Sequence, residues 1–280
     1  MSRNVRASLA EQTLRIVEDR GYDNAAGIRV DLNDAIASCF EGTRLYEVED
    51  IMRLIVEQRA QGGAVRNTVL DVVNETTLAG LAALLEENDS PVAVLNFASA
   101  KNPGGGFLGG SQAQEESLAR SSALYGSLAR VESFYRRHRA SSSLLYSDAM
   151  ILSPHCPVFR DDDGALLDAS RLAGFVTSAA PNAGAIATNR PDELPSIEGT
   201  FIRRTEGVLA LAAAHGYRRL VLGAWGCGVF RNDPVMVAAV FARHLKHGDW
   251  ARRFERVRFS VLDTSRDAAT FTAFERAFAV

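Results

Sequence analysis

An apolar run at residues 92–97 leads into a glycine-rich turn, and this junction constrains the fold more than any other part of the 280-residue chain. Three consecutive glycines occupy positions 104–106, and two adjacent carboxylates, Glu115 and Glu116, follow near the start of a helical pattern. Consecutive glycines cost backbone entropy, so a chain keeps them where positive φ or a close backbone approach is needed. The N–H groups of such a turn, with the N-terminus of the next helix, attract an anion. The segment therefore predicts a strand, turn and helix that hold a phosphate-bearing ligand beside an acid.

Apolar strand-like runs alternate with helical patterns along most of the chain. The runs cover residues 68–74, 91–97, 144–152, 175–180, 220–224 and 257–262, and the helical patterns cover residues 76–87, 114–139, 199–215, 234–246 and 268–278. This alternation predicts a mixed, largely parallel α/β sheet covered by helices on both faces. The first part of the chain has helical patterns at residues 5–20, 34–40 and 48–59, with a short strand-like run at 27–32. We therefore expect a mainly helical N-terminal extension, residues 1–66, packed on an α/β domain, residues 67–280.

A second glycine-rich loop follows the strand-like run at residues 220–224. It contains Gly226, Cys227, Gly228, Val229 and Phe230, and Pro234 then suits the first turn of a helix. Ligands of open α/β sheets bind outside the carboxyl ends of the strands. Because both glycine loops follow strands, we expect them to bind opposite sides of one pyrophosphate.

Composition excludes several classes of protein. The net charge of −3 gives no overall basic character, so duplex nucleic acid is not an expected partner. The three cysteines, Cys39, Cys156 and Cys227, form no closely spaced pair, which argues against a zinc ribbon or a disulfide framework and fits a reducing cytoplasm. No run of 18 apolar residues and no secretory leader is visible, so no membrane contact is expected. The acidic stretch at residues 161–164 reads as an Asp-Gly hairpin turn and not as a calcium loop, so no metal site is expected.

The glycines at positions 104–109 also match the G-x-G-x-x-G fingerprint of dinucleotide-binding proteins, which would indicate an NAD-dependent dehydrogenase. That fingerprint directly follows its strand and leads through a short helix to a second strand. Here seven residues separate Asn96 from Gly104, and the helical pattern continues to about Arg139. The dehydrogenase is therefore kept only as a third alternative.

The glycine triplet, a seven-residue spacer and the sequence Gln114-Glu115-Glu116 together resemble the signature of bacterial-type poly(ADP-ribose) glycohydrolases, which are macrodomain proteins. The loop at residues 226–230 looks like the diphosphate-binding loop of the same family. The resemblance implies a macrodomain-like fold and hydrolysis of the ribose–ribose O-glycosidic bonds of poly(ADP-ribose), with release of ADP-ribose. It also implies ADP-ribosylated proteins as partners, a function in the DNA damage response, no cofactor and a monomeric protein.

The resemblance assigns a function to each residue that matches the family's motifs. Glu116 matches the catalytic acid, and Glu115 matches the glutamate that holds the ribose at the scissile bond. Gln114 would contact the adenine side of the ligand. Contacts with ribose hydroxyls are implied for the segment that contains Asn96, Asn102, Gly104, Gly105 and Gly106. The diphosphate would be bound by backbone N–H groups of Gly226, Cys227, Gly228 and Val229. The ring of Phe230 would pack against the terminal ADP-ribose.

The chemistry of glycoside hydrolysis agrees with this reading, because departure of a sugar alkoxide needs a proton donor and negative charge stabilises an oxocarbenium-like transition state. A helix N-terminus lowers the pKa of a nearby carboxyl group, whereas a general acid at neutral pH needs a raised pKa, so burial, the adjacent Glu115 and the phosphates of the ligand would together have to outweigh that effect. Macrodomains also include non-catalytic ADP-ribose readers and hydrolases of mono-ADP-ribosyl groups, and both stay open as alternatives. The presence of both Glu115 and Glu116 favours the chain-cleaving enzyme.

Overall fold

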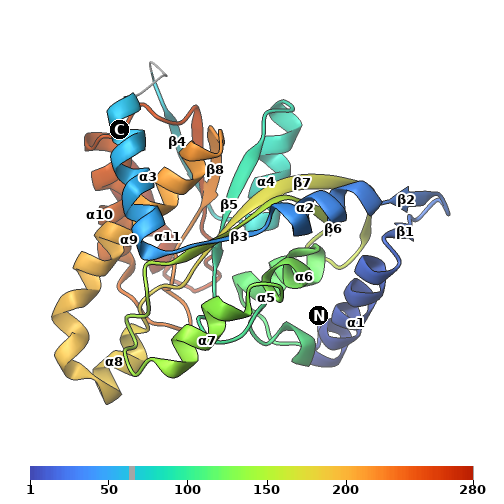
Figure 1. Ribbon diagram of the computed structural model, residues 1–280, viewed down its shortest axis with the longest axis horizontal. Coiled ribbons are helices and arrows are strands. Elements are labelled where there is room, and N and C mark those ends of the chain that lie inside the picture. The colour runs from blue at the N-terminus through green and yellow to red at the C-terminus, as the bar shows by residue number, and fades with distance from the viewer. Residues whose placement is uncertain (63–66, 280) are drawn as a thin grey trace.

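Strand β5 (Val92–Phe97) is the central strand of a seven-stranded sheet with the order β3-β6-β7-β5-β8-β9-β4 (Figure 1). The computed structural model describes residues 1–62 and 67–279. Residues 92–95 of β5 are all buried, as expected for a parallel strand with helices on both faces. The other strands of this sheet are β3 (Arg44–Tyr46), β4 (Val69–Val73), β6 (Met150–Arg160), β7 (Leu166–Ser178), β8 (Arg219–Leu222) and β9 (Arg256–Ser260).

The sheet is mixed but largely parallel. Strands β7, β5, β8, β9 and β4 run parallel to one another, whereas β6 is antiparallel to both β7 and β3. The turn between β6 and β7 is closed by a bond from the Asp161 N–H to the Ala165 carbonyl, 3.0 Å, with Gly164 at a φ of 91°. The predicted α/β class and the predicted hairpin at residues 161–164 are therefore confirmed.

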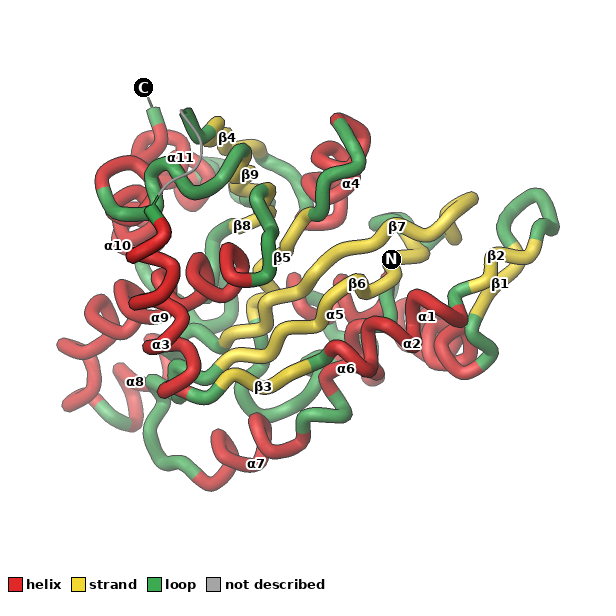
Figure 2. Tube along the Cα trace, turned by 45° about the horizontal axis from the view of Figure 1, so that its top comes forward, coloured by secondary structure: helices red, strands yellow, loops and turns green. Residues whose placement is uncertain are grey.

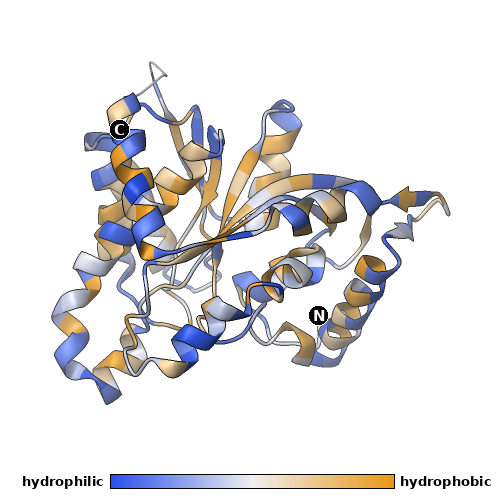
Figure 3. Cartoon of the chain, viewed as in Figure 1, coloured by the Kyte–Doolittle hydropathy of each residue, from blue (hydrophilic) through white to orange (hydrophobic). Residues whose placement is uncertain are grey.

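Helices cover both faces of the sheet, as Figure 2 shows. Side chains alternate along a strand, so Ala93 and Leu95 join one hydrophobic core, while Val92 and Val94 join the other. The first core packs under α3 (Val48–Gln61), α9 (Ile197–Ala214), α10 (Pro234–Ala242) and α11 (Ala269–Phe278). The second packs under α2 (Asn33–Gly42), α4 (Thr77–Glu87), α5 (Gln114–Ser121), α6 (Leu124–Leu128) and α7 (Glu132–Ala140). In Figure 3 the helix ribbons carry both hydrophilic and hydrophobic residues.

The prediction of a single helix over residues 114–139 is wrong, because the chain forms three helices there, α5, α6 and α7. Ser122 is extended, with φ of −151° and ψ of 177°, and it forms a β-bridge with Val158. The Ala123 N–H donates to the Pro157 carbonyl at 3.1 Å. Pairing with β6 therefore replaces helical hydrogen bonds at this point, and no local apolar spacing reveals such a partner.

Three predicted strands have different bounds in the structure. The run at residues 144–152 is irregular up to Ala149, and β6 begins only at Met150. The run at 175–180 belongs to β7, which begins at Leu166 and ends at Ser178. The run at 27–32 contributes β2 (Arg29–Asp31) to a separate hairpin with β1 (Gly21–Asp23), which projects from one end of the molecule (Figure 1).

The N-terminal region contributes one strand to the main sheet. Strand β3 pairs with the start of β6, where Arg44 lies opposite Leu152, and α1 (Arg3–Glu18) packs beside α5. The division of the chain at residues 66 and 67 stays a prediction, because residues 63–66 lie outside the described part of the chain. Within the described residues, no helix is both long enough and apolar enough to cross a bilayer.

Gly80 allows α4 to approach the sheet closely. A Cβ atom at Gly80 would lie 2.0 Å from Ser260 Oγ and 2.8 Å from Glu75 Oε1. We expect Gly80→Ala to lower the free energy of unfolding by about 1–3 kcal/mol through overpacking, although alanine favours a helix by about 1 kcal/mol. The exposed Gly199 in α9 is the matched control, because only the flexible end of Arg203 lies near its Cβ position, at 3.7 Å. Denaturant unfolding would contradict this account if Gly80→Ala were as stable as Gly199→Ala.

Candidate active site

The two glycine-rich loops meet at a cavity of about 840 Å³ beside the carboxyl ends of β5 and β8. Five carboxylate residues line it, and within the described part of the chain no lysine or arginine does. An anion in this cavity can therefore be bound only by backbone N–H groups, helix N-termini and neutral side chains. Most of the candidate residues line the cavity directly, namely Asn102, Gly105, Gly106, Gln114, Glu115, Glu116, Gly226, Cys227, Gly228, Val229 and Phe230.

Glu115 lies at the inner end of the cavity and is only 3% exposed. Its Oε1 accepts from Asn96 Nδ2 at 3.2 Å, and its Oε2 accepts from the Ser99 N–H at 2.6 Å. Burial raises the pKa of Glu115 to about 8, although the hydrogen bonds from Ser99 and Asn96 act in the opposite direction. Burial thus outweighs these hydrogen bonds, so Glu115 is mostly protonated at neutral pH.

Asn96 and Gly104 lie behind the cavity wall and do not line it. Asn96 is fully buried at the end of β5, where its amide also donates to Thr177 Oγ1 at 3.2 Å. Gly104, with a φ of 64°, packs against Phe107, Tyr125 and Ala119. Both residues hold Glu115 in place: the Asn96 amide donates to Glu115 Oε1, and the Gly104 N–H also donates to this carboxyl group.

Glu116 is bound by the glycine turn. Its Oε1 accepts from the Gly106 N–H at 3.0 Å. A Cβ atom at Gly105, where φ is 59°, would lie 2.4 Å from that same oxygen. Only glycine at position 105 therefore leaves room for the Glu116 carboxylate.

The first glycine loop thus uses its own N–H groups internally. Those of Gly104 and Gly106 act on the two glutamates, and that of Gly105 donates to the Asn102 carbonyl at 3.1 Å. Sequence reasoning expected this turn to bind a phosphate, but the groups that it binds in the structure are the carboxyl groups of the following helix. This arrangement fixes the glutamates and leaves phosphate binding to other donors.

The second loop supplies such donors. Among the described residues, the N–H groups of Gly226, Gly228, Val229 and Phe230 have no protein acceptor, whereas the Cys227 N–H donates to the Ala224 carbonyl at 3.1 Å. The loop is held from below by Asn232, whose amide donates to the carbonyls of Pro181, at 2.8 Å, and Gly226, at 2.9 Å. Val229 is 79% exposed, and a Cβ atom at Gly228 would meet nothing within 4 Å. The loop backbone is therefore open to a ligand on its outer side.

Phe230 borders the cavity next to an irregular segment, residues 141–149. The ring of Tyr146, which has a φ of 62°, lies 6.3 Å from the Phe230 ring centre. On one side of the segment, Asp148 accepts from the buried Arg204 of α9 at 2.9 Å, and Arg203 lies beside it. These ion pairs hold the segment that supports Phe230.

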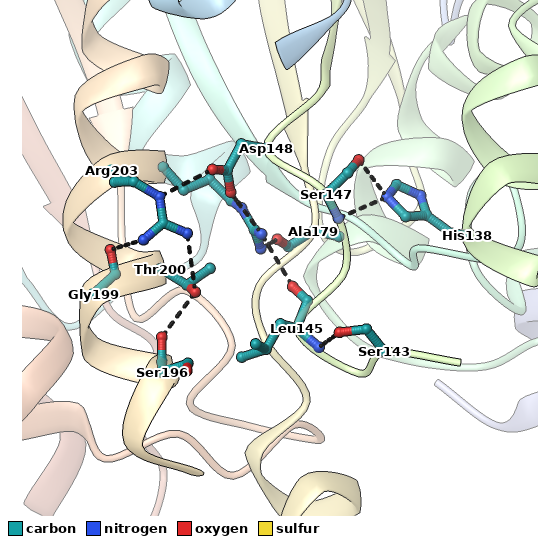
Figure 4. Close-up of polar contacts among 11 residues, drawn as sticks. His138, Ser143, Leu145, Ser147, Asp148, Ala179, Ser196, Gly199, Thr200 and Arg203 are labelled. Atoms are coloured by element: carbon teal, nitrogen blue, oxygen red, sulfur yellow. Dashed lines mark hydrogen bonds and ion pairs between the residues drawn. The ribbon is translucent and has the colours of Figure 1, made fainter. Parts of the chain in front are cut away.

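His138 of α7 binds the other side of the same segment. Its Nε2 accepts from the Ser147 N–H at 3.1 Å and lies 2.8 Å from Ser147 Oγ (Figure 4). Burial lowers the pKa of His138 to about 4, so the ring is neutral at physiological pH and can accept this bond. Segment 141–149 is thus fixed from two helices.

The side chain of Gln114 ties the start of α5 to β5. Its Oε1 accepts from the Phe97 N–H at 2.9 Å, and its Nε2 donates to the Leu95 carbonyl at 2.8 Å. Both ends of the amide are therefore engaged in the structure, and the contact with an adenine stays a prediction.

Sequence reasoning missed Ser99, Thr177 and Tyr146, which support the candidate residues. Ser99 has a recognisable signal, because it is a small polar residue directly after a buried strand. Thr177 lies in a neighbouring strand, and Tyr146 reaches Phe230 only through the tertiary fold, so neither carries a local signal.

Replacing Glu115 by Gln should make stability less dependent on pH. The pKa of Glu115 in the folded protein, about 8, lies above its ordinary value of 4.5. Between these values unfolding releases a proton, so the stability of the wild type falls as the pH rises, and this loss is complete above about pH 8. A Gln side chain avoids the loss and can still accept from the Ser99 N–H.

We therefore expect the melting temperature of Glu115→Gln, relative to wild type, to rise from pH 4.5 to pH 8 and then to level off. Glu132→Gln, which changes an exposed carboxyl group of α7, is the control and should show no such trend. A difference between Glu115→Gln and wild type that stays constant over this range would show that Glu115 ionises normally in the folded protein.

Known proteins resemble this chain in sequence and in structure. The family model of the catalytic domain of microbial-type PARG, the abbreviation of poly(ADP-ribose) glycohydrolase, matches residues 10–161. The poly(ADP-ribose) glycohydrolase (PARG) of Thermomonospora curvata is 46% identical, with a TM-score of 0.92 over 98% of this chain and 100% of that chain. Its complex with the inhibitor ADP-HPD gives a TM-score of 0.91 at 45% identity over the same shares.

A second relative has been solved with ADP-ribose bound. The PARG of Deinococcus radiodurans in that complex is 46% identical, with a TM-score of 0.81 over 86% of this chain and 95% of that chain. No curated protein matched the chain. The matched family model and the two bacterial relatives show that the chain belongs to the microbial-type PARG family.

Proposed function

We propose that this chain hydrolyses the ribose–ribose O-glycosidic bonds of poly(ADP-ribose) and releases ADP-ribose. The observation that carries the proposal is the placement of Glu115 and Glu116 across one cavity from the free N–H groups of the second glycine loop. That geometry suits a ligand with a diphosphate at one end and a scissile sugar bond at the other. The relatives solved with ADP-ribose and with ADP-HPD support the same ligand class.

Glu116 is the proposed catalytic acid. Its Oε1 is held by the Gly106 N–H, while its Oε2 has no acceptor or donor among the described residues and can reach the substrate. Glu116 gives its proton to the leaving ribose oxygen as the glycosidic bond breaks. It then takes a proton from the water that adds to the anomeric carbon, which restores the acid.

Glu115 and the substrate complete the reaction site. Mostly protonated Glu115 binds a ribose hydroxyl without adding a full negative charge to the site. The diphosphate of the substrate supplies negative charge near the oxocarbenium-like transition state. The proposed steps use no metal and no cofactor, because one carboxyl group performs both proton transfers.

We also propose that the protein acts as a monomer in the cytoplasm, on ADP-ribosylated proteins formed in the DNA damage response. The free thiols of the buried Cys39 and Cys156 fit a reducing compartment. A macrodomain reader and a hydrolase of mono-ADP-ribosyl groups are the competing functions. Comparing ADP-ribose release from polymer and from mono-ADP-ribosylated protein separates all three.

Glu116→Gln should reduce polymer hydrolysis by at least about 10²-fold, because it removes only the proton transfer in the transition state. Its affinity for ADP-ribose, measured by calorimetry, should stay near that of wild type. Glu132→Gln serves as the control, since Glu132 lies on the outer surface of α7 and pairs with Arg139. Wild-type turnover by Glu116→Gln would rule out Glu116 as the catalytic acid.

Gly228→Val should weaken ADP-ribose binding, because a side chain there projects from the open side of the second loop without disturbing the protein. Gly228→Ala is the graded control and should have a smaller effect. Melting temperatures of both variants should match wild type. Unchanged affinity of a folded Gly228→Val variant would mean that the diphosphate binds elsewhere.

A further inference from the structure

The N-terminal helix α1 binds the active-site loop through two arginines. Arg3 Nε donates to the Gly109 carbonyl at 2.8 Å, and Arg6 Nε donates to the Gly110 carbonyl at 2.8 Å. These contacts join residues that are 106 and 104 positions apart in the sequence. Helix α1 therefore makes directed polar contacts with the loop that joins the glycine turn to α5.

A third arginine binds the next carbonyl along the loop. Arg120 of α5 donates to the Ser111 carbonyl at 2.7 Å and is only 4% exposed. Burial lowers the pKa of Arg120, and the nearby Arg6 lowers it further, while Glu116 acts in the opposite direction. The positively charged guanidinium groups of Arg6 and Arg120 repel each other, so binding both to the loop has an electrostatic cost.

Apolar packing supports the same contact. Phe107, in the short helix η1 (Phe107–Gly109), is fully buried against Ala10 of α1 and Ala119 of α5, and its ring centre lies 4.7 Å from that of Tyr125. Gly110 has a φ of 72°, and a Cβ atom there would lie 2.2 Å from the Arg3 carbonyl oxygen. The loop backbone thus lies directly against the backbone of α1.

This loop determines where the Gly106 peptide lies. The N–H groups of Gly109 and Ser111 both donate to the Gly106 carbonyl, at 3.1 and 3.2 Å. The N–H of Gly106 in turn donates to Glu116 Oε1 at 3.0 Å. A continuous series of bonds therefore connects the arginines of α1 to the carboxyl group of Glu116.

We infer that α1 is a positioning element of the active site and that Arg3 and Arg6 are positioning residues for Glu116. They hold the loop carbonyls so that the Gly106 N–H fixes one oxygen of Glu116 and leaves the other aimed at the scissile bond. The inference rests on the proposed glycohydrolase function. Displacements of about 1 Å at a reacting group can cost 10²-fold in rate, so loosening the loop affects turnover more than binding.

The double variant Arg3→Ala/Arg6→Ala tests the inference with poly(ADP-ribose) as substrate. We expect kcat to fall about tenfold while KM stays within about twofold, because the second glycine loop still binds the diphosphate. Hydrogen exchange in the peptide over residues 104–111 should become faster. Arg15→Ala is the matched control on the same helix, since the Arg15 side chain is 72% exposed and, among the described residues, pairs only with Glu11, so it should leave kcat and exchange unchanged.

A conservative variant and the wild type separate the possible outcomes. Arg3→Lys/Arg6→Lys keeps one donor at each position and should recover kcat to within about threefold of wild type. If the double alanine variant does not fold, Arg6→Ala alone is measured by the same criteria. Unchanged kcat and unchanged exchange in a folded alanine variant would overturn the inference, whereas absence of ADP-ribose release by the wild type would instead overturn the proposed function.

Discussion

The bonds between backbone N–H groups and two adjacent carboxyl groups determine the geometry of this active site. Glu115 can be buried in the protein interior because Asn96, at the end of β5, and the Ser99 N–H donate hydrogen bonds to its two oxygens. Glu116 lies against the glycine turn because position 105 has no side chain. The central strand, the turn and the start of α5 must therefore be fixed together, and the three arginines around residues 109–111 and the amide of Gln114 do this.

The cavity proposed to bind poly(ADP-ribose) has no lysine or arginine among its described lining residues. Backbone N–H dipoles are directional and short-ranged, so they favour a phosphate only where it fits the loop. Charged side chains would attract any polyanion over a Debye length of about 10 Å. The proposed site would therefore select a ligand by its shape at contact, without long-range attraction from basic side chains of the described lining.

The sequence predicted the alternation of strands and helices and the meeting of two glycine loops at strand ends, because both depend on local patterns. It did not predict the break at Ser122, since the competing partner, Val158, lies in another strand. The sequence also did not show which acceptors the N–H groups of the first loop bind, because a glycine turn can donate equally well to a ligand or to a carboxyl group of the protein. Arg3 and Arg6 read as ordinary residues of a surface helix, since their acceptors are more than one hundred positions away.

The order of the strands has a consequence for biosynthesis. Central β5 lies between β7 and β8, and the edge strand β4 pairs with β9, where Val69 lies opposite Arg256. During translation, β5 therefore cannot complete its pairing until residues 166–178 and 219–222 have been synthesised. Strand β4 cannot pair until residues 256–260 have been synthesised. Such non-local parallel pairing folds slowly, and the unpaired edges meanwhile offer a surface for aggregation. A ribosome-bound fragment that ends before β9 should thus depend on chaperones, and its β8 edge is the surface that a chaperone would have to shield.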